Sequence, residues 1–595
     1  MRKYIFFAGL LLCFFGMEAQ PGIEKPYHKY APAPPLGWNS WDIFGTTVTE
    51  RQIKEQADAM AIHLLPSGYQ YLTVDIQWYE PESKSHAYNP RAVLTMDEYG
   101  RLTPGLKKFP SAAEGKGFKP LADYVHSKGL KFGIHIMRGI PRQAVEKNTP
   151  VFGTNAKAQD IALKNSTCAW NPDMYGVDAT KPEGQAYYNS IIQMYADWGV
   201  DYIKVDDISR PYDDVQKAEI EAIRKAIDKT GRPIVLSLSP GATPVKAGEH
   251  VMNHANMWRI TDDFWDSWGL LHAMFERLDV WTPFRGPGHF PDADMLPIGI
   301  IDFNRPTKFT REEQYTLMSL WAIGRSPLIF GGDMTKLDDF TKQMLTNPDM
   351  LKVNQESTNN RQVYNDKNLI VWTADVPDSE DKYVALFNAQ SKGDNIDLSN
   401  ADYASPVIAG NGSSQEISIA VKGGKKLVLF VNDGGNGFDW DHVAWVDPVL
   451  HGPNGELKLT TLKWISATSG WGNATVDKTC EGRPLIVDGK PATGIGAHAK
   501  SVIIYELPEG YETFTTKGVV LKETGSVVFG VLVDKGKIEF RDESDVKVDF
   551  KTIGMKRKAR VVDLWSHTEL GVFKKRFSRA LKQHSAGLYR ISPVK

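Results

Sequence analysis

The segment DYIKVDDISR, residues 201–210, has the pattern of a short β-strand that ends in two carboxylates. Hydrophobic residues alternate with polar ones up to Asp206 and Asp207, as in a strand whose side chains point alternately to two faces. Similar apolar runs that end in polar residues recur from about residue 35 to residue 335. They are LGWNSW (36–41), YQYLTVDIQW (69–78), LKFGIHIM (130–137), DYIKVDDI (201–208), PIVLSLSP (233–240), NMWRITDD (256–263), GPGHFPDADM (286–295) and SPLIFGGDM (326–334).

Amphipathic helical stretches separate several of these runs. They include TERQIKEQADAMA (49–61), KPLADYVHSKG (119–129), AEIEAIRKAIDKT (218–230) and REEQYTLMSLWAI (311–323). Strands that alternate with helices indicate parallel βα units. Eight such units predict a closed (β/α)8 TIM barrel over about residues 33–355, in which the Gly- and Pro-rich run at 286–295 is the least strand-like.

Polar and aromatic side chains follow the predicted strands. In a barrel of this type, the active site lies at the C-terminal ends of the strands. A single polar residue at such an end is often only a helix cap or a solvated turn. The number expected on this one rim nevertheless favours a catalytic site: Trp41, Asp75, His135, Lys204, Asp206, Asp207, Ser239, Arg259, Asp262, Asp263 and Asp294.

The carboxylates on this rim suit the hydrolysis of a glycosidic bond. That reaction needs two carboxyl groups flanking the anomeric carbon, about 5–5.5 Å apart when configuration is retained. The nucleophile must stay ionised, and Lys204 points to the same face of its strand as Asp206. Asp206 is therefore the expected nucleophile, whereas Asp207 points away or begins the loop. Spacing does not decide between Asp262 and Asp263 as the second carboxyl group.

The composition describes a globular protein of several domains. The chain has 595 residues, more than one domain of about 100–200 residues needs. A net charge of −2 gives no electrostatic reason to expect binding of nucleic acid or of an anionic membrane. Three cysteines in the whole chain indicate a large core rather than a small disulfide-stapled domain.

The N-terminal segment has the features of a secretory signal peptide. Residues 1–3 are basic, residues 4–15 are apolar, and residues 16–20 resemble a cleavage site. Because Leu12 precedes Cys13, the segment does not fit a lipid-anchor site. We expect residues 1–19 to be a signal peptide and the protein to be periplasmic or secreted. No other segment is long and apolar enough to span a bilayer.

Longer stretches of the barrel region resemble glycoside hydrolase family 27, the family of α-galactosidases and α-N-acetylgalactosaminidases. The matching stretches are PPLGWNSW, YLTVD, YADWGVDYIKVD, WRITDDFWDSW, GPGHFPDADMLPIG and LWAIGRSPLIFGGDM, in this order. The resemblance implies a retaining exo-glycosidase that acts on terminal α-D-galactosidic linkages without a cofactor or metal. It assigns the nucleophile to Asp206 and the acid/base to Asp263, and its sugar-binding positions fall on Trp41, Asp75, Lys204 and Arg259.

Three departures from the family pattern concern the sugar that is bound. Ile76 stands where galactosidases have a second aspartate, which suits β-L-arabinopyranose, a sugar without the C6 hydroxyl of galactose. His135 replaces a tyrosine, and Ser239 replaces a glutamate, with Ala242 nearby, as in the N-acetylgalactosaminidase pattern. We expect His135 and Ser239 to contact the sugar. Because one such exchange can change substrate preference strongly, galactose, N-acetylgalactosamine and arabinopyranose all remain open.

After about residue 355, short strands with Gly, Asn and Asp turns are typical of antiparallel β-sandwiches. The two ends of this region resemble the family's C-terminal sandwich, and its middle resembles an NPCBM carbohydrate-binding module. We expect a discontinuous sandwich of residues 356–402 plus 543–595, with the module inserted at 403–542. Trp464 and Trp471 are either sugar platforms or core residues, and the acidic turn at 432–442 leaves calcium binding open.

Two other functional classes stay open. A carbohydrate-binding protein with an inactive barrel would not need the Asp206 and Asp263 pair. A hydrolase with a metal-activated water would need a cluster of His, Cys or Asp at metal-ligand spacing, which the sequence does not display. The expected partner is a carbohydrate, and the sequence gives no oligomeric state.

Overall fold

The computed structural model describes residues 25–594, apart from residues 395, 437–439 and 556–557. The predicted signal peptide at 1–19 and part of the acidic turn at 432–442 lie outside the described residues.

Eight parallel strands form a barrel in the first part of the chain. Their order is β10-β9-β8-β7-β3-β2-β1-β13, and Leu296, just after β10, pairs in parallel with Phe330 of β13, so the edge strands meet. This confirms the predicted barrel, including its least strand-like run. The strands are β1 (Leu36–Asn39), β2 (Tyr71–Val74), β3 (Lys131–Met137), β7 (Tyr202–Asp206), β8 (Val235–Leu238), β9 (Met257–Arg259), β10 (Phe290–Asp292) and β13 (Leu328–Phe330).

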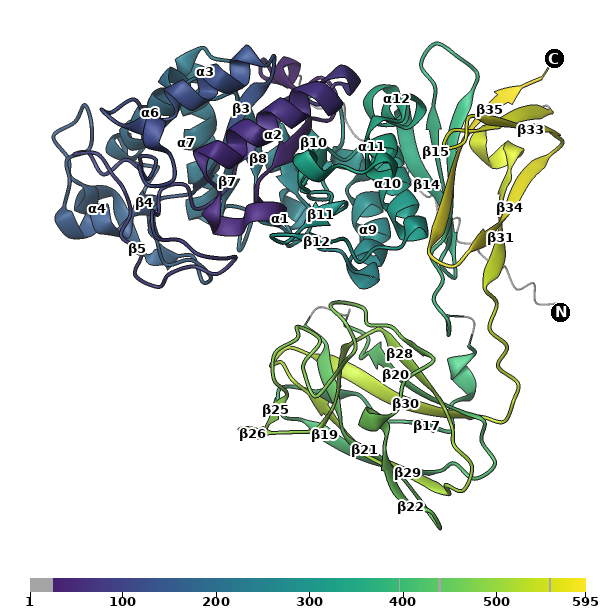
Figure 1. The fold of residues 1–595 in the computed structure, drawn as a ribbon. Helices are drawn as coiled ribbons and strands as arrows, with labels where there is room; N and C mark the ends of the chain where they lie inside the picture. The colour runs from purple at the N-terminus through teal and green to yellow at the C-terminus, as the bar shows by residue number, and fades with distance from the viewer. Residues whose placement is uncertain (1–24, 395, 437–439, 556–557, 595) are drawn as a thin grey trace, which may run out of the picture.

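Helices between the strands form the outer layer of the barrel (Figure 1). The helix α2 begins at Glu50 because Thr49 and Gln52 form a capping box, and Thr310 and Glu313 do the same for α10. The main helices are α2 (Glu50–His63), α3 (Lys119–Ser127), α6 (Pro182–Asp197), α7 (Asp214–Thr230), α8 (Gly248–Met252), α9 (Trp268–Val280) and α10 (Arg311–Gly324). Shorter elements are α1 (Trp41–Phe44), α4 (Arg142–Lys147), α5 (Ala158–Ile161), α11 (Asp339–Thr346), α12 (Pro348–Glu356), β4 (Ile140–Pro141), β5 (Ala162–Thr167), β6 (Met174–Val177), β11 (Ile300–Ile301) and β12 (Arg305–Pro306).

A β-sandwich packs against the barrel and is built from two distant parts of the chain. One sheet has the strand order β14-β15-β16-β35-β32-β33, and Lys382 of β16 lies opposite Ile591 of β35. The strands β31 and β34 form a separate two-stranded sheet. Trp372, Phe387 and Leu588 belong to the barrel core, so one face of the larger sheet covers the barrel. The strands are β14 (Thr358–Asp366), β15 (Leu369–Asp375), β16 (Lys382–Asn388), β31 (Glu543–Asp549), β32 (Ala559–Asp563), β33 (Thr568–Phe573), β34 (Arg576–Lys582) and β35 (Ser585–Pro593).

A second sandwich lies between β16 and β31 in the chain and has its own hydrophobic core (Figure 1). One sheet contains β17, β18, β20, β23, β28 and β30, and the other contains β19, β21, β22, β24, β27 and β29. Tyr403 of β17 pairs with Val531 of β30, so the ends of this insert lie side by side. The strands are β17 (Tyr403–Ala404), β18 (Ile408–Ala409), β19 (Ser414–Ala420), β20 (Lys426–Asp433), β21 (His442–Gly452), β22 (Gly455–Lys458), β23 (Ser466–Ala467), β24 (Thr475–Val476), β25 (Ile486–Val487), β26 (Lys490–Pro491), β27 (Gly494–His498), β28 (Ser501–Glu506), β29 (Thr513–Val520) and β30 (Ser526–Asp534).

Two cysteines lie within the described residues. Cys168 in the barrel and Cys480 in the insert are both buried, and neither forms a disulfide. Within the described parts of the chain, no helix combines the length and apolar character needed to cross a membrane.

Candidate active site

Asp206 is the last residue of β7 and lies next to a histidine from the neighbouring strand. The parallel register places Met137 of β3 beside Asp206 and His135 beside Lys204. His135 Nε2 is 2.8 Å from Asp206 Oδ2, and the other carboxylate oxygen accepts a 2.9 Å hydrogen bond from the backbone N–H of Asp207. Both carboxylate oxygens of Asp206 are thus held in place. Because 11% of the side chain remains exposed, the carboxylate is still accessible.

Asp207 points to a different environment from its neighbour. Its carboxylate pairs with Arg138 at 3.0 Å, and its backbone has the left-handed φ of 58° that begins the loop. Burial raises the pKa of Asp207 to about 6, against the lowering effect of Arg138. The two adjacent carboxylates are therefore separated as strand alternation predicts, and only Asp206 joins His135.

A buried ion pair lies beside Asp206. Lys204 Nζ donates a 2.8 Å hydrogen bond to Asp75 Oδ2, and Asn39 Nδ2 donates to the same oxygen at 2.7 Å. Burial, the largest effect, would raise the pKa of Asp75, but the charges of Lys204 and His135 and the hydrogen bonds from Lys204 and Asn39 together outweigh it, and the pKa falls to about 2. Burial would likewise lower the pKa of Lys204, but the charges of Asp75 and Asp206 together raise it. Both groups stay charged and can serve as an acceptor and a donor for sugar hydroxyls.

Arg259 ends β9 and holds two more carboxylates. Its Nη2 donates to Asp263 Oδ1 at 3.1 Å, and its Nη1 is 2.8 Å from Asp294 Oδ1. Half of the Asp263 side chain is exposed, whereas Asp294 is buried, and burial raises the pKa of Asp294 to about 7. Asp262 instead pairs with Arg210 at 2.8 Å on the surface. Asp262 and Asp263 thus have different partners, an exposed arginine for Asp262 and the buried Arg259 for Asp263.

A tyrosine that was not predicted from the sequence packs against a predicted sugar-binding residue. The ring of Tyr88 lies parallel to that of Trp41 at 6.2 Å and is 5.2 Å from Trp170. Burial and then the negative charges of Asp206, Asp263 and Asp75 raise the pKa of Tyr88 strongly. The ring contacts place Tyr88 beside Trp41, one of the predicted sugar-binding residues.

Several buried polar side chains in the same region have an atom without a hydrogen-bond partner among the described residues, including His135 Nδ1 and Arg259 Nε. Ser239 follows β8, and its side-chain oxygen is another. Asp42 Oδ2 also belongs to this group, and burial followed by the charges of Asp294 and Asp263 raises the pKa of Asp42 far above its usual range. Ile76, next to Asp75, is buried and offers only its backbone N–H, which donates to Asp75 Oδ1 at 2.8 Å. The sequence reasoning did not select Asp42.

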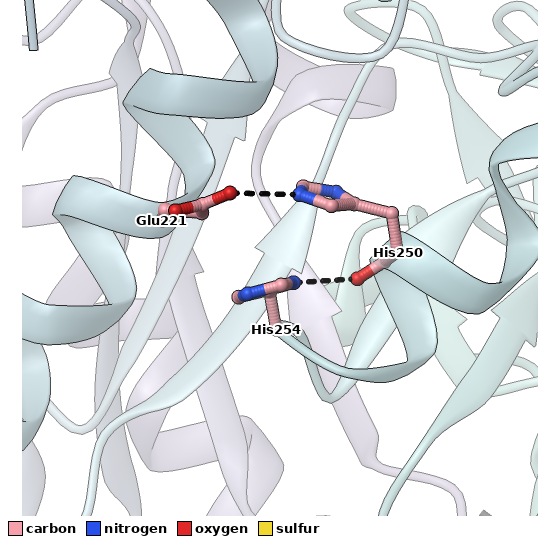
Figure 2. A group of neighbouring side chains, drawn as sticks. All are labelled: Glu221, His250 and His254. Carbon is pink, nitrogen blue, oxygen red and sulfur yellow. Dashed lines mark hydrogen bonds and ion pairs between the residues drawn. The ribbon is translucent and has the colours of Figure 1, made fainter. Parts of the chain in front are cut away.

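A possible metal-binding group occurs elsewhere, between two outer helices. Ligand atoms of Glu221, His250 and His254 lie within 4.8 Å of one another (Figure 2). The sequence displays no cluster with metal-ligand spacing, because Glu221 comes from α7, whereas the histidines come from α8 and the turn after it. Only the packing of these helices brings the three side chains together.

Comparisons with known proteins agree with this geometry. Residues 174–356 match the family Melibiase_2, alpha galactosidase A, and residues 377–451 and 455–565 match the NPCBM/NEW2 domain. The second match extends beyond the insert into β16, β31 and β32, whose pairing places them in the discontinuous sandwich.

Individual enzymes are also similar to this chain in sequence or structure. The chain is 30% identical to an alpha-galactosidase of Cyamopsis tetragonoloba, over 62% of this chain and 76% of that protein. It is 30% identical to human alpha-N-acetylgalactosaminidase, over 57% of this chain and 73% of that protein. The crystal structure of a GH27 β-L-arabinopyranosidase from Geobacillus stearothermophilus matches with a TM-score of 0.69 and 37% identity, covering 96% of this chain and 98% of that one. The chain belongs to glycoside hydrolase family 27, the α-galactosidase family, and carries an NPCBM domain.

Proposed function

We propose that the protein is a retaining exo-glycosidase that hydrolyses terminal α-D-galactosidic linkages of oligo- or polysaccharides. The observation that carries this proposal is that two partly exposed carboxylates follow separate barrel strands. Asp206 ends β7, and Asp263 lies beyond the end of β9, where Arg259 holds it. A double displacement needs two carboxyl groups that approach one sugar carbon from different sides.

In the proposed mechanism, a carboxylate oxygen of Asp206 attacks the anomeric carbon. The bond from that carbon to the leaving oxygen breaks, and the proton of Asp263 passes to the leaving oxygen. A water molecule then attacks the glycosyl ester, Asp263 takes the proton of the water, and Asp206 is released as a carboxylate. The N–H of Asp207 donates a hydrogen bond to Asp206 and helps to orient its carboxylate, and half of the Asp263 side chain is exposed to solvent.

The remaining predicted site residues have the roles of sugar ligands in this proposal. The charged pair of Lys204 and Asp75 supplies a donor and an acceptor, and Arg259 adds a second cation. Trp41 offers an aromatic face, while His135 and the unpartnered hydroxyl of Ser239 complete the polar lining.

Hydrolysis of β-L-arabinopyranosides is the second candidate. Ile76 favours it, because this buried apolar residue stands beside Asp75 where a carboxylate would bind the C6 hydroxyl of galactose. The similarity to the Geobacillus arabinopyranosidase agrees with this candidate. The small Ser239 favours N-acetylgalactosaminides in the same way, since it leaves room for a 2-acetamido group.

A panel of three aryl glycosides tests the proposal. The enzyme is assayed with an aryl α-D-galactoside, an aryl β-L-arabinopyranoside and an aryl α-N-acetylgalactosaminide, and the product anomer is identified by NMR. We expect turnover with first release of the retained anomer. No turnover of any of the three would contradict the proposal and favour the carbohydrate-binding alternative, and an inverted product would exclude Asp206 as nucleophile.

We also propose that the protein is exported, to the periplasm or beyond, and that the inserted module binds carbohydrate. Export is supported by the basic, apolar and small-residue pattern of residues 1–19. Carbohydrate binding is supported by the NPCBM match. N-terminal sequencing of the mature protein and glycan-array binding of the full chain would test these two points.

A further inference from the structure

A cavity of about 340 Å³ lies where the inserted module meets the rim of the barrel. Its lining includes His86, Trp265, Asp266, Arg305 and Lys308 from the barrel, and Asn473 from the module. The volume lies at the lower end of the range of about 300–1,000 Å³ that is usual for small-molecule sites. The cavity is therefore large enough to receive a small ligand, and two domains contribute to it.

The cavity adjoins the proposed catalytic groups on the side of the acid/base. Trp265 is two residues beyond Asp263 in the chain. The ring of His86 lies edge-on between two tryptophans, 5.1 Å from Trp41 and 5.6 Å from Trp265, and His86 Nε2 is 3.1 Å from the carbonyl oxygen of Trp41. Because the leaving group of a retaining glycosidase departs beside the proton donor, this is where the next sugar unit would lie.

The polar groups in the cavity are fixed and their charges balance. Arg305 forms a two-point ion pair with Asp266, at 2.6 Å and 3.0 Å, and donates to Asp302 at 2.8 Å. Lys308 donates through its backbone N–H to Asp266 at 2.6 Å. Fixed donors and acceptors beside aromatic rings suit a neutral, hydroxyl-rich ring better than an ionic ligand.

The module presents Asn473 on a rigid loop. Trp471 packs its ring 5.3 Å from that of His442. Two backbone hydrogen bonds of 3.1 Å, Gly470 N–H to the carbonyl of His498 and Asn473 N–H to the carbonyl of Cys480, fix the loop on either side. Trp471 thus acts as an anchor of the loop within the module.

The contact of this loop with the barrel depends on a glycine. Gly269 lies in the first turn of α9, and a Cβ atom at this position would be 2.9 Å from the carbonyl oxygen of Gly472. A side chain here would push the two backbones apart. The absence of one allows the module to approach the rim closely enough for Asn473 to line the cavity.

We propose that this cavity is the subsite for the pyranose unit on the leaving-group side of the scissile bond, and that the inserted module completes it through Asn473. This proposal rests on the glycosidase function proposed above. It gives the module a direct part in choosing the substrate, because the unit next to the cleaved sugar contacts both domains.

Two substrates with the same terminal sugar test the proposal. A glycosyl fluoride has a leaving group of one atom and does not reach the cavity, whereas an oligosaccharide fills it. For Asn473→Ala we expect kcat/KM on the oligosaccharide to fall about three- to tenfold, the effect of one neutral hydrogen bond. The kcat/KM of this variant on the glycosyl fluoride should stay within twofold of wild type. Asn454→Ala, an exposed asparagine of the same module, is the matched control and should change neither value.

A second variant protects the conclusion if Asn473→Ala misfolds. Gly269→Val should displace the module loop and lower kcat/KM on the oligosaccharide, while kcat/KM on the glycosyl fluoride should not change. Equal losses on both substrates, or no loss in either variant, would overturn the subsite. If the wild-type enzyme hydrolyses neither substrate, the proposed glycosidase function is itself wrong.

The cluster of Glu221, His250 and His254 carries an independent inference (Figure 2). His254 Nδ1 is 2.7 Å from the carbonyl oxygen of His250, and a carbonyl only accepts, so Nδ1 carries the hydrogen and Nε2 keeps its lone pair. His250 Nδ1 is 2.8 Å from the hydroxyl of Tyr212, which leaves Nε2 facing Glu221 at 3.4 Å. Histidines that bind a metal through Nε2 are held at Nδ1 in this way.

We propose that these three side chains bind a divalent transition-metal ion of the zinc type, which ties α8 to α7. Two imidazole nitrogens and one carboxylate are a donor set that zinc favours, with a water molecule as the fourth ligand. All three residues are half-buried, so the site is accessible to an ion from solution and is partly shielded from water.

Zinc titration of the chelator-treated full-length protein tests this site. We expect one zinc ion per chain by calorimetry and a higher melting temperature with zinc. His254→Ala should weaken binding by at least about tenfold, since even changes around metal ligands cost about 10–100-fold. His63→Ala, a half-buried histidine of α2, is the control. Binding that is absent from the wild-type protein, or unchanged in both His254→Ala and Glu221→Gln, would overturn the proposal.

Discussion

Lys204 Nζ of β7 lies 2.8 Å from Asp75 Oδ2, which follows β2, and the two side chains meet across the intervening strand β3. The lysine thus forms its ion pair with a carboxylate two strands away, while Asp206 on its own strand is held by His135. Burial by itself would raise the pKa of Asp75, but the poorly screened charge of Lys204, with that of His135 and the hydrogen bonds to the carboxylate, lowers it to about 2.

This ion pair predicts how stability changes in acid. A carboxylate whose pKa is lowered by folding stabilises the protein above its unfolded pKa, and that contribution is lost as the pH falls toward the folded pKa. For Asp75 the window runs from about pH 4 to pH 2, and the contribution is about 2 kcal/mol. Asp75→Asn should lower stability at neutral pH and flatten its dependence on pH in this window. Denaturant unfolding from pH 5 to pH 2.5 would show it; parallel curves for wild type and variant would contradict the assignment.

Asp206→Asn should nearly abolish turnover. Removal of the attacking carboxylate is expected to lower kcat by a factor on the order of 10⁴ or more on any aryl glycoside that the wild type hydrolyses. Asp262→Asn is the matched control, because Asp262 is an exposed aspartate paired with Arg210 on the surface and should keep near-normal activity. Near-normal activity of Asp206→Asn would refute the nucleophile.

Asp263→Ala should lower the rate of hydrolysis most for substrates whose leaving group must be protonated in order to depart. We expect a loss of about 10²–10⁴-fold on an alkyl glycoside or oligosaccharide, the usual contribution of a general acid. The dinitrophenolate group of a dinitrophenyl glycoside leaves without protonation, so the rate of the first step on this substrate should fall much less. Equal losses of the pre-steady-state rate on both substrates would argue against proton donation by Asp263.

Ile76→Asp should move sugar preference toward galactose. A new carboxylate beside Asp75 would accept the C6 hydroxyl, and a hydrogen bond to a charged group corresponds to about 10–100-fold in affinity. The measurement is the ratio of kcat/KM for an aryl α-D-galactoside to that for the matching β-L-arabinopyranoside. Ile76→Asn, which has nearly the same shape without the charge, should give a smaller shift. An unchanged ratio in both variants would mean that Ile76 does not contact the sugar.

The barrel was predictable because its signals are local. Hydrophobic runs that end in polar residues mark the strands, and the capping residues Thr49 and Thr310 mark helix starts. Strand alternation alone separated Asp206 from Asp207, as the different partners of the two carboxylates confirm. Even the Gly- and Pro-rich run at 286–295 contains a barrel strand, since β10 needs only three residues when its neighbours supply the pairing.

The features that were missed depend on packing between distant segments. Tyr88 and Trp170 come from loops without periodicity, and only in the folded barrel does Tyr88 pack between Trp41 and Trp170. Spacing could not choose between Asp262 and Asp263, because the choice depends on whether Arg210 or Arg259 is within reach. The cavity around Asn473 requires the module to be docked against the barrel, which no local pattern encodes.

The pairing of β16 with β35 has a consequence for synthesis on the ribosome. The barrel and β14–β16 emerge first, but the partner of β16 is made only after the inserted module and β31–β34. Until then, one edge of a growing sheet has no neighbour, and exposed edges promote aggregation. Folding of the nested module during this time would favour the pairing of β16 with β35. Because β17 and β30 bring the two ends of the module together, a shorter effective loop must then close between the two parts of the sandwich. The nested module would thus act as a folding aid for the domain that surrounds it.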